Sequence, residues 1–329
     1  AQSVLNSEND VVQLKTADEE PKEEEIVKIA EQIKIYSPDL IVAIGGGSVI
    51  DTGKLSWLLY ENPEFDLPNA NGNISSYQLR KLAKFAVIPT TFGSGAEVSS
   101  AAAFTKKNNG KKSIIVSHDF LPDFLFLDAS MGESLPRRIL FSSAFDAITH
   151  AIEGYVSLAG NSFVKSLAVP AIRNIINALK DILDNGSSHK SLETLCHSSY
   201  WAGVVQNHCS VGATHAFAHK LSERGISHGL ANAVFLVPVM KMNASKSDVY
   251  KNLVKEVGYN NLDMFTGELI SLIYNSDIIN KSEFVTLSQD HELIVKGAME
   301  DVTFRTNPVL LSVEDMKEIL NHAKLFINE

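Results

Sequence analysis

The chain has 329 residues, of which 45% are hydrophobic and 8% aromatic, enough to bury a large core and typical of two domains. This composition excludes disordered and fibrous architectures. Its 39 acidic and 29 basic side chains give a formal net charge of −10, which disfavours nucleic acid and anionic membranes as partners. No apolar run approaches the ~20 residues that cross a bilayer, and the acidic N-terminus lacks a secretory signal, so we expect the cytoplasm.

The first third of the sequence alternates short β-branched runs with an amphipathic stretch, which predicts an α/β domain with a parallel sheet. Residues 11–14 are predicted to form a strand, and the spacing of apolar residues predicts a helix over 23–36. The continuous apolar run at 40–44 is typical of a parallel strand that is buried on both faces. Further short strands are predicted at 85–88, 114–116 and 125–127.

After about residue 135 the pattern becomes helical without β-rich interruptions. The predicted helices cover 144–156, 162–183, 192–205 and 212–221. Pro136 stands where the pattern changes, and proline is tolerated in the first turn of a helix. We therefore place a domain boundary near Ser134, with an α/β domain over 1–133 and an all-helical domain over 134–329. Cys196 and Cys209 are expected to be buried thiols, because two cysteines cannot build a disulfide framework.

A run of three glycines follows the predicted strand at 40–44. Gly45, Gly46 and Gly47 have no Cβ atoms, so the backbone can approach a pyrophosphate closely. The helix expected to begin near Ser48 directs free N–H groups and its positive dipole end at the same anion. The spacing matches neither the dinucleotide fingerprint nor a P-loop, and a plain tight turn is the competing interpretation. The loop predicts a phosphate site.

A second loop of small residues follows the predicted strand at 85–88. It runs from Pro89 through Thr90 and Thr91 to Ser94, and it is rich in hydroxyl groups. Ligands of open α/β sheets bind at the carboxyl ends of the strands, so both loops would face one crevice. Two such loops predict a dinucleotide site more strongly than either loop alone.

Five residues of the second half predict a metal site. Asp146 and His150 stand four apart, as do His215 and His219, so each pair shares a helix face with Cβ atoms about 5 to 6 Å apart. A carboxylate with imidazoles suits Fe²⁺ or Zn²⁺ rather than Ca²⁺ or Mg²⁺. Spacing leaves the later ligands open, because His215 with His219 fits as well as His215 with His228.

These motifs together closely resemble the iron-containing, or group III, alcohol dehydrogenase family. The resemblance covers nearly the whole chain, from Val11 to Pro308. The residues that carry it are Gly45 to Ser48 with Asp51 and Lys54, Pro89 to Thr91 with Gly93 and Glu97, Asp128, Pro136, Asp146 to His150 with Glu153, His215 with His219, and His228-Gly229 with Ala231 to Ala233.

The resemblance implies a nucleotide-binding α/β domain and an all-α domain for metal and substrate. NAD or NADP and one divalent metal, Fe²⁺ with Zn²⁺ as the alternative, would lie in the cleft between them. It also implies that Asp146, His150, His215 and His228 are the metal ligands, and that His219 lies beside the nicotinamide and the substrate.

The implied cofactor contacts come from both loops and from one lysine. They are Gly45, Gly46, Gly47, Ser48, Asp51, Thr90, Thr91, Ser94 and Lys112. Lys111 is a rival to Lys112 for the place near the adenosine ribose. Family members carry a strand, a helix and a strand ahead of Val11, and this segment usually holds the residue that reads the ribose hydroxyl. We therefore expect an N-terminally truncated domain, either a fragment or a short form, and the start at Ala1 favours a fragment; NAD and NADP are not distinguished.

The implied reaction is hydride transfer between NAD(P) and a small primary alcohol or its aldehyde, in a homodimer or higher homo-oligomer. The metal would act as a Lewis acid that lowers the pKa of the alcohol hydroxyl. His219 would carry the proton, with a purely structural hydrogen bond as the alternative. Phe163, Trp201 and Phe217 are expected to line the substrate pocket.

Other functions on the same architecture use different ligands. Dehydroquinate synthase binds its metal with a glutamate and two histidines, and glycerol dehydrogenase has no fourth protein ligand, so Asp146 with His228 argues against both. A maleylacetate reductase-like enzyme is the nearest rival on this fold. A non-catalytic binding protein derived from such an enzyme would be expected to have lost ligands, and all four are present.

Overall fold

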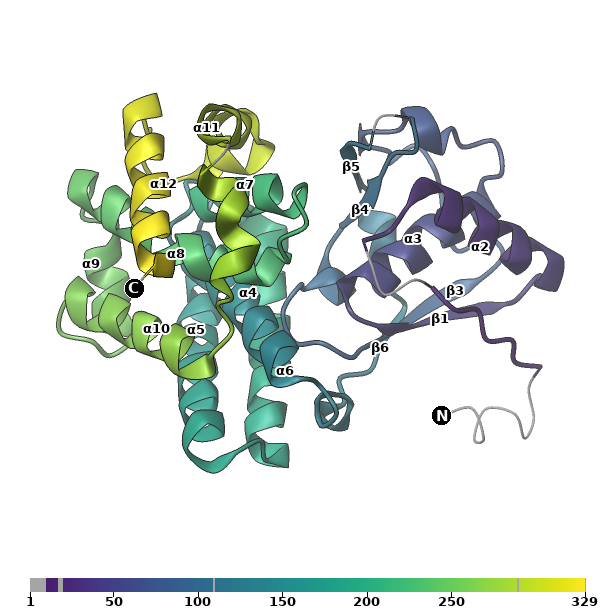
Figure 1. The fold of residues 1–329 in the computed structure, drawn as a ribbon. Coiled ribbons are helices and arrows are strands. Elements are labelled where there is room, and N and C mark those ends of the chain that lie inside the picture. Colours follow the sequence, from purple (N-terminus) through teal and green to yellow (C-terminus); the bar gives the residue numbers. More distant parts are fainter. Residues whose placement is uncertain (1–9, 17–19, 109, 289, 329) are drawn as a thin grey trace.

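The computed structural model describes residues 10–16, 20–108, 110–288 and 290–328. The chain forms an N-terminal α/β domain and a C-terminal helical domain that lie side by side (Figure 1). The elements of the N-terminal domain are α2 (Glu23–Tyr36), β1 (Leu40–Gly45), α3 (Gly47–Glu61), η1 (Leu67–Asn69), β2 (Gly72–Asn73), β3 (Lys84–Pro89), η2 (Ala96–Val98), β4 (Ala101–Thr105), β5 (Lys112–Val116), η3 (His118–Phe120), β6 (Phe124–Leu125) and η4 (Ala129–Gly132).

The C-terminal domain consists of helices and short 3₁₀ turns among its described residues. They are α4 (Arg137–Val156), α5 (Ser162–Asn185), α6 (His189–Cys209), α7 (Ala213–Ser222), α8 (His228–Lys246), α9 (Val249–Glu256), α10 (Leu262–Ser276), η5 (Lys281–Ser288), α11 (His291–Glu300), η6 (Val302–Thr306) and α12 (Val313–Asn328). No helix in the described part of the chain is both long and apolar enough to cross a bilayer.

The main sheet of the N-terminal domain is parallel, with strand order β1-β3-β6. Leu40 pairs with Lys84 and Gly45 with Pro89, so β1 and β3 end at the same edge of the sheet. The two loops predicted to bind a dinucleotide therefore leave the sheet side by side, as expected for a parallel pair. The second sheet has the order β2-β5-β4 and contains one antiparallel pair, β4 with β5.

The predicted helix over 23–36 is confirmed as α2, with Ile26, Ile29 and Ile33 on its buried face. Predicted strands are confirmed at β1, β3 and β5. The strand predicted at 11–14 is wrong: residues 10–16 form no strand, and no described strand lies beside them to complete a ladder. Strand β6 begins one residue earlier than the predicted strand at 125–127, and β4 was not predicted at all.

The expectation that both faces of the sheet are buried is also wrong for the described residues. Helices α2 and α3 cover one face (Figure 1). On the other face Leu40, Val42 and Ile44 of β1 and Phe124 of β6 remain exposed. A continuous apolar run such as that of β1 is typical of a strand buried on both faces of a sheet. In this structure only one face of β1 is covered, so its exposed residues alternate along the strand.

The helical domain agrees with the sequence pattern. The four predicted helices correspond to α4 to α7. Helix α4 begins seven residues before its predicted start, α6 extends beyond its prediction at both ends, and α5 and α7 match their predictions to within two residues. Pro136 immediately precedes α4 at its N-cap. Cys196 and Cys209 are buried free thiols, and burial raises the pKa of each to about 12.

Close backbone contacts join the second loop to the helical domain. Phe92 is buried in the core of the helical domain. Gly95 has a φ of 63°, and a Cβ there would lie 2.6 Å from the Cα of Gly203 in α6. Asn207 of α6 accepts hydrogen bonds from the backbone N–H and the hydroxyl of Ser100. The loop is thus fixed between the two domains.

Candidate active site between the two domains

The glycine loop presents a helix start that lacks a protein cap. Gly46 is the N-cap of α3, no side chain caps the helix, and its first turn contains no acidic residue. The N–H groups of Gly47 and Ser48 precede the first intrahelical bonds, which begin at Val49. Such a terminus favours an anion through its free donors and its dipole.

The glycines also have a packing role that the sequence did not reveal. A Cβ at Gly45 would lie 2.5 Å from the Cβ of Val49, and one at Gly47 would lie 2.8 Å from Oγ of Ser94. A Cβ at Gly46 would meet Thr91 Oγ1 at 3.2 Å. The chain itself therefore excludes side chains at Gly45 and Gly47, while Gly46 is the glycine whose Cβ has the least severe contact.

These contacts place the second loop directly against the first. The N–H of Thr90 also donates to the carbonyl oxygen of Gly45 at 2.9 Å. Thr90, Thr91, Ser94 and the residues from Gly46 to Ser48 are all half-buried. The residues expected to contact the cofactor from both loops therefore form one surface at the edge of the sheet.

A buried lysine ties the second loop to α3. Lys54 is fully buried and its Nζ donates to the carbonyl oxygens of Ala96, Ser99 and Ala101 at 2.7, 2.7 and 3.0 Å. Asp51, one turn earlier, lies 4.0 Å from the Lys54 ammonium and accepts from the N–H of Ala103. Burial raises the pKa of Asp51 and Lys54 opposes this effect.

Lys112 is the first residue of β5. Its Nζ forms an ion pair with Glu20 at 2.6 Å, and its charge acts on Asp51 and on His228. Lys112 is half-buried, whereas Lys111 is exposed. Lys112 therefore lies close enough to these predicted site residues for its charge to act on them.

The structure brings Asp146, His150, His215 and His228 together around one carboxylate oxygen. Oδ1 of Asp146 lies 3.6 Å from Nε2 of His150 and 3.5 Å from Nε2 of both His215 and His228. One ligand atom from each of Asp146, His150 and His215 can be chosen so that all lie within 4.8 Å of one another. Those three residues are buried, whereas the side chain of His228 is 31% exposed.

Three helices supply this cluster. Asp146 and His150 project from one face of α4, His215 comes from α7, and His228 is the first residue of α8. The helices α4, α7 and α8 pack together in the core of the helical domain, as Figure 1 shows. The ligand groups are therefore held by rigid elements rather than by loops.

Two residues hold the cluster in place. Both are among the residues that carry the family resemblance, but the sequence assigned no role to either. Glu153, one turn beyond His150 on α4, accepts from His215 Nδ1 at 2.7 Å and from the N–H groups of Gly212 and Thr214 at 2.8 and 2.7 Å. Asn232 on α8 donates to Oδ1 of Asp146 at 2.8 Å. The position of Glu153 on the same helix face as Asp146 and His150 was a signal that could have identified it.

Burial and mutual contacts set the charges of the cluster. Burial opposes ionisation of Asp146, but His150, His228 and His215 hold its pKa well below the usual range. Burial lowers the pKa of His150 to about 4. Burial also disfavours charge on His215, but hydrogen bonds to Asp146 and Glu153 raise its pKa to about 9. An ionised carboxylate and a neutral imidazole are ready ligands, and a cation would displace the proton of His215.

His219 lies beside the cluster and faces a different carboxylate. Its ring centroid is 5.3 Å from that of His228 and 6.3 Å from that of His215. Its Nδ1 lies 3.0 Å from Oδ2 of Asp301, not against Asp146. Asp301 is 82 residues away in the sequence, so no local pattern could have identified this pair.

The aromatic residues expected to line a substrate pocket are mostly elsewhere. Phe217 is fully buried and stacks on Phe235 with ring centroids 4.5 Å apart, so it belongs to the core. Phe163 is 52% exposed and lies beside His208, on the surface. Trp201 is half-buried on α6. Side-chain direction, which the sequence does not give, explains the error.

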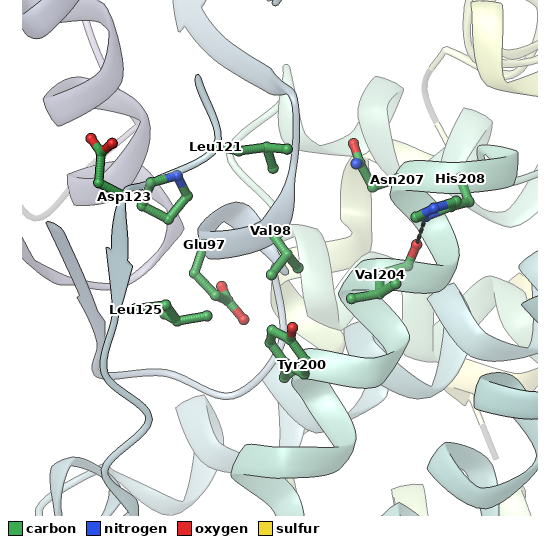
Figure 2. A pocket seen from close by; sticks show the side chains of 10 residues that line it. Glu97, Val98, Leu121, Asp123, Leu125, Tyr200, Val204, Asn207 and His208 are labelled. Carbon is green, nitrogen blue, oxygen red and sulfur yellow. Dashed lines mark hydrogen bonds between the residues drawn. The ribbon is translucent and has the colours of Figure 1, made fainter. Parts of the chain in front are cut away.

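A cavity of about 350 Å³ lies between the N-terminal domain and α6 (Figure 2). Its lining residues are Glu97, Val98, Leu121, Pro122, Asp123, Leu125, Tyr200, Val204, Asn207 and His208. None of them is a residue predicted to bind the cofactor or the metal. This cavity is therefore separate from the predicted site.

Comparison with family models gives two matches that together span most of the chain. Residues 1–129 match the family described as iron-containing alcohol dehydrogenase. Residues 140–324 match the C-terminal domain of the iron-containing alcohol dehydrogenase family.

Curated relatives are similar over nearly the full length of the chain. An NADPH-dependent butanol dehydrogenase from Clostridium saccharobutylicum is 29% identical over 91% of this chain and 80% of its own length. An alcohol dehydrogenase from Thermococcus barophilus is 30% identical over 92% of this chain and 82% of its own.

Two solved structures agree with these matches. The iron-containing alcohol dehydrogenase from Thermococcus thioreducens superposes with a TM-score of 0.83 at 28% identity, over 93% of this chain and 82% of that one. A 1,3-propanediol oxidoreductase superposes with a TM-score of 0.84 at 26% identity, over 92% of this chain and 81% of that one. The chain belongs to the iron-containing alcohol dehydrogenase family.

Proposed function

We propose that the chain interconverts a small primary alcohol and its aldehyde: RCH₂OH + NAD(P)⁺ gives RCHO, NAD(P)H and H⁺. As a member of its family the chain is a metal-dependent, NAD(P)-linked alcohol dehydrogenase or aldehyde reductase. The observation that carries the proposal is the convergence of three imidazole nitrogens within 3.6 Å of one oxygen of Asp146. Relatives that are named for butanol and 1,3-propanediol support a small alcohol as substrate.

The proposed metal ligands are Asp146, His150, His215 and His228. One carboxylate and three imidazoles suit Fe²⁺, with Zn²⁺ as the alternative. The three Nε2 atoms converge on one carboxylate oxygen of Asp146, an arrangement that suits a shared cation better than hydrogen bonds alone. When bound, the divalent ion supplies Lewis acidity that lowers the pKa of an alcohol hydroxyl and polarises an aldehyde.

Residues around these ligands fix their orientation. Glu153 accepts from Nδ1 of His215, so His215 presents Nε2 toward Asp146. Asn232 holds Oδ1 of Asp146 through its amide. Partners of this kind set the tautomer and direction of a ligating histidine and raise its basicity.

We expect Glu153→Gln to weaken metal binding by about 10 to 100-fold, the usual cost of losing such a carboxylate. The glutamine amide cannot accept from three donors, so it would set an N–H against His215 or against a backbone N–H. Competition with a chelator measures the affinity. Glu256→Gln is the matched control, since Glu256 accepts from the Tyr155 hydroxyl, away from the cluster. Equal affinities in both variants would contradict the assignment of Glu153.

For the cofactor we propose a site formed by the two loops and by Lys112. Gly45, Gly46, Gly47 and Ser48 would receive the pyrophosphate at the uncapped start of α3. The hydroxyls of Thr91 and Ser94 lie beside that start, and Thr90 joins the two loops through its backbone N–H. Asp51 lies one turn further along α3. Lys112 would lie near the adenosine ribose. The proposal covers both NAD and NADP.

His219 is the proposed catalytic residue. Its imidazole lies against His228, so it is close enough to the proposed metal ligands to exchange a proton or a hydrogen bond with a bound substrate. A histidine suits this role because its ordinary pKa lies near neutral pH.

The remaining expectations accompany this function. We propose a domain boundary near Ser134, which falls between the ranges of the two family matches. We also propose a homodimer or higher homo-oligomer and a cytoplasmic location.

The test is a screen of small alcohols and aldehydes with NADH and NADPH, and with their oxidised forms. The protein is first stripped of metal and then loaded anaerobically with Fe²⁺, or separately with Zn²⁺. We expect turnover of a primary alcohol or aldehyde that requires one of these ions and stops when the ion is removed. Turnover that is the same in metal-free protein, or absent with every ion and nucleotide, would contradict the proposal.

A further inference from the structure

The hydrogen bond between His219 and Asp301 links two parts of the helical domain that are 82 residues apart in the sequence. His219 lies near the end of α7, and Asp301 follows α11 and is the N-cap of η6. Nδ1 of His219 and Oδ2 of Asp301 are 3.0 Å apart. Both side chains are largely buried, 15% and 12% exposed, so solvent does not compete strongly for either group.

The other oxygen of Asp301 is already bound. Oδ1 accepts from the N–H of Thr303 at 3.0 Å and from its hydroxyl at 2.8 Å. Burial disfavours ionisation of Asp301, but its hydrogen bonds with His219 and Thr303 lower its pKa to about 2. An ionised carboxylate only accepts hydrogen bonds. His219 must therefore carry a hydrogen on Nδ1.

The position of the ring makes the second nitrogen of His219 available. The ring stacks on His228 with an interplanar angle of 19° and meets His215 nearly edge-on, at 69°. Within the described part of the chain, Nε2 of His219 has no hydrogen-bond partner. In the tautomer with hydrogen on Nδ1, this nitrogen is an acceptor.

We propose that Asp301 is a positioning residue that locks His219 in the Nδ1–H tautomer and so presents Nε2 as the acceptor for the substrate hydroxyl. Thr303 takes part by holding the carboxylate in a single orientation. The proposal rests on the proposed function, because it assumes that His219 meets an alcohol. Its distinctive prediction concerns the tautomer, which is measurable without turnover.

The substitution Asp301→Asn keeps the size and shape of the side chain, so it tests whether Asp301 sets the tautomer of His219 or only packs against it. The two donors of Thr303 require the amide oxygen at the Oδ1 position, so the amide NH₂ must face Nδ1 of His219. The tautomer then changes to Nε2–H, and the acceptor at Nε2 is lost. We expect kcat to fall about 10 to 100-fold. This is a part of the rate enhancement of about 10² to 10⁴-fold that a positioned general acid or base provides. We expect metal content and KM for the alcohol to change little.

Two-bond ¹H–¹⁵N correlation spectra of the imidazoles report the tautomer directly, in Zn²⁺-loaded full-length protein without substrate. The signals of His219 are those lost in His219→Gln. We expect Nδ1–H in the original protein and Nε2–H in Asp301→Asn. Asp66→Asn is the matched control, since Asp66 caps the short helix η1 in the N-terminal domain through Asn69.

A second variant keeps the proposal testable if Asp301→Asn does not fold. Thr303→Val removes one of the two donors on Oδ1 and keeps the carboxylate as the acceptor for Nδ1–H of His219. We therefore expect the Nδ1–H tautomer to persist, with a smaller fall in kcat because the carboxylate is held less firmly. An Nε2–H tautomer in the original protein, or an unchanged tautomer and kcat in Asp301→Asn, would overturn the role of Asp301. Absence of metal-dependent turnover in the original protein would overturn the proposed function, and the spectra would still test the tautomer.

Discussion

Replacing His228 with alanine is expected to remove the metal and the activity together. Nε2 of His228 lies 3.5 Å from Oδ1 of Asp146, as does that of His215, so its loss takes away one of four proposed ligands. His219→Ala should instead keep most of its metal and turn over more slowly. Its Nδ1 faces Asp301 rather than Asp146, so it acts beside the ion. Loss of a group that acts beside a metal typically lowers metal affinity or activity by about 10 to 100-fold.

Elemental analysis of the two purified variants measures this difference. The two substitutions form a matched pair, because both replace a histidine with alanine and the two imidazoles stack on each other. A metal-free His219→Ala beside a metal-loaded His228→Ala would show that the assignment of the two histidines is reversed.

Replacing Gly46 with valine is expected to abolish nucleotide binding. A Cβ at Gly46 would already lie 3.2 Å from Thr91 Oγ1 and 3.4 Å from Thr91 Cγ2, so Thr91 must shift to admit a side chain there. The side chain would occupy the space in front of the uncapped N–H groups of α3, where the pyrophosphate is expected. Calorimetry with NADH and NADPH measures the binding.

Gly267→Val is the control for this experiment. Gly267 lies on α10 in the helical domain, and a Cβ there has no neighbour within 4 Å. Circular dichroism shows whether each variant is folded. A folded Gly46→Val protein with unchanged affinity for both nucleotides would refute the assignment of the glycine loop to the pyrophosphate.

Elements whose apolar residues follow a clear period could be predicted from sequence. The helix over 23–36 was predicted with both ends correct, because Ile26, Ile29 and Ile33 mark one face and no neighbour is needed to define it. Strand β4 could not be predicted: its alanines have low β-propensity, and the antiparallel pairing with β5 forms the strand. Residues 11–14 illustrate the reverse case, a β-rich run without a strand beside it.

The candidate site shows the same division between local and long-range information. Spacing alone identified the pairs Asp146 with His150 and His215 with His219, because each pair lies on one helix. Whether His219 or His228 meets Asp146 depends on how α7 and α8 pack against α4, which spacing does not contain. The observed distances support the ligand set that the family resemblance implied.

Crystals grown with Fe²⁺ or Zn²⁺ provide the sharpest measurement, by anomalous diffraction at the absorption edge of the metal. We expect one strong peak at coordination distance, about 2.0 to 2.2 Å, from an oxygen of Asp146 and from Nε2 of His150, His215 and His228. His219 should remain bound to Asp301 and outside that distance. A peak coordinated by His219 in place of His228, or no peak at this cluster, would contradict the proposed metal site.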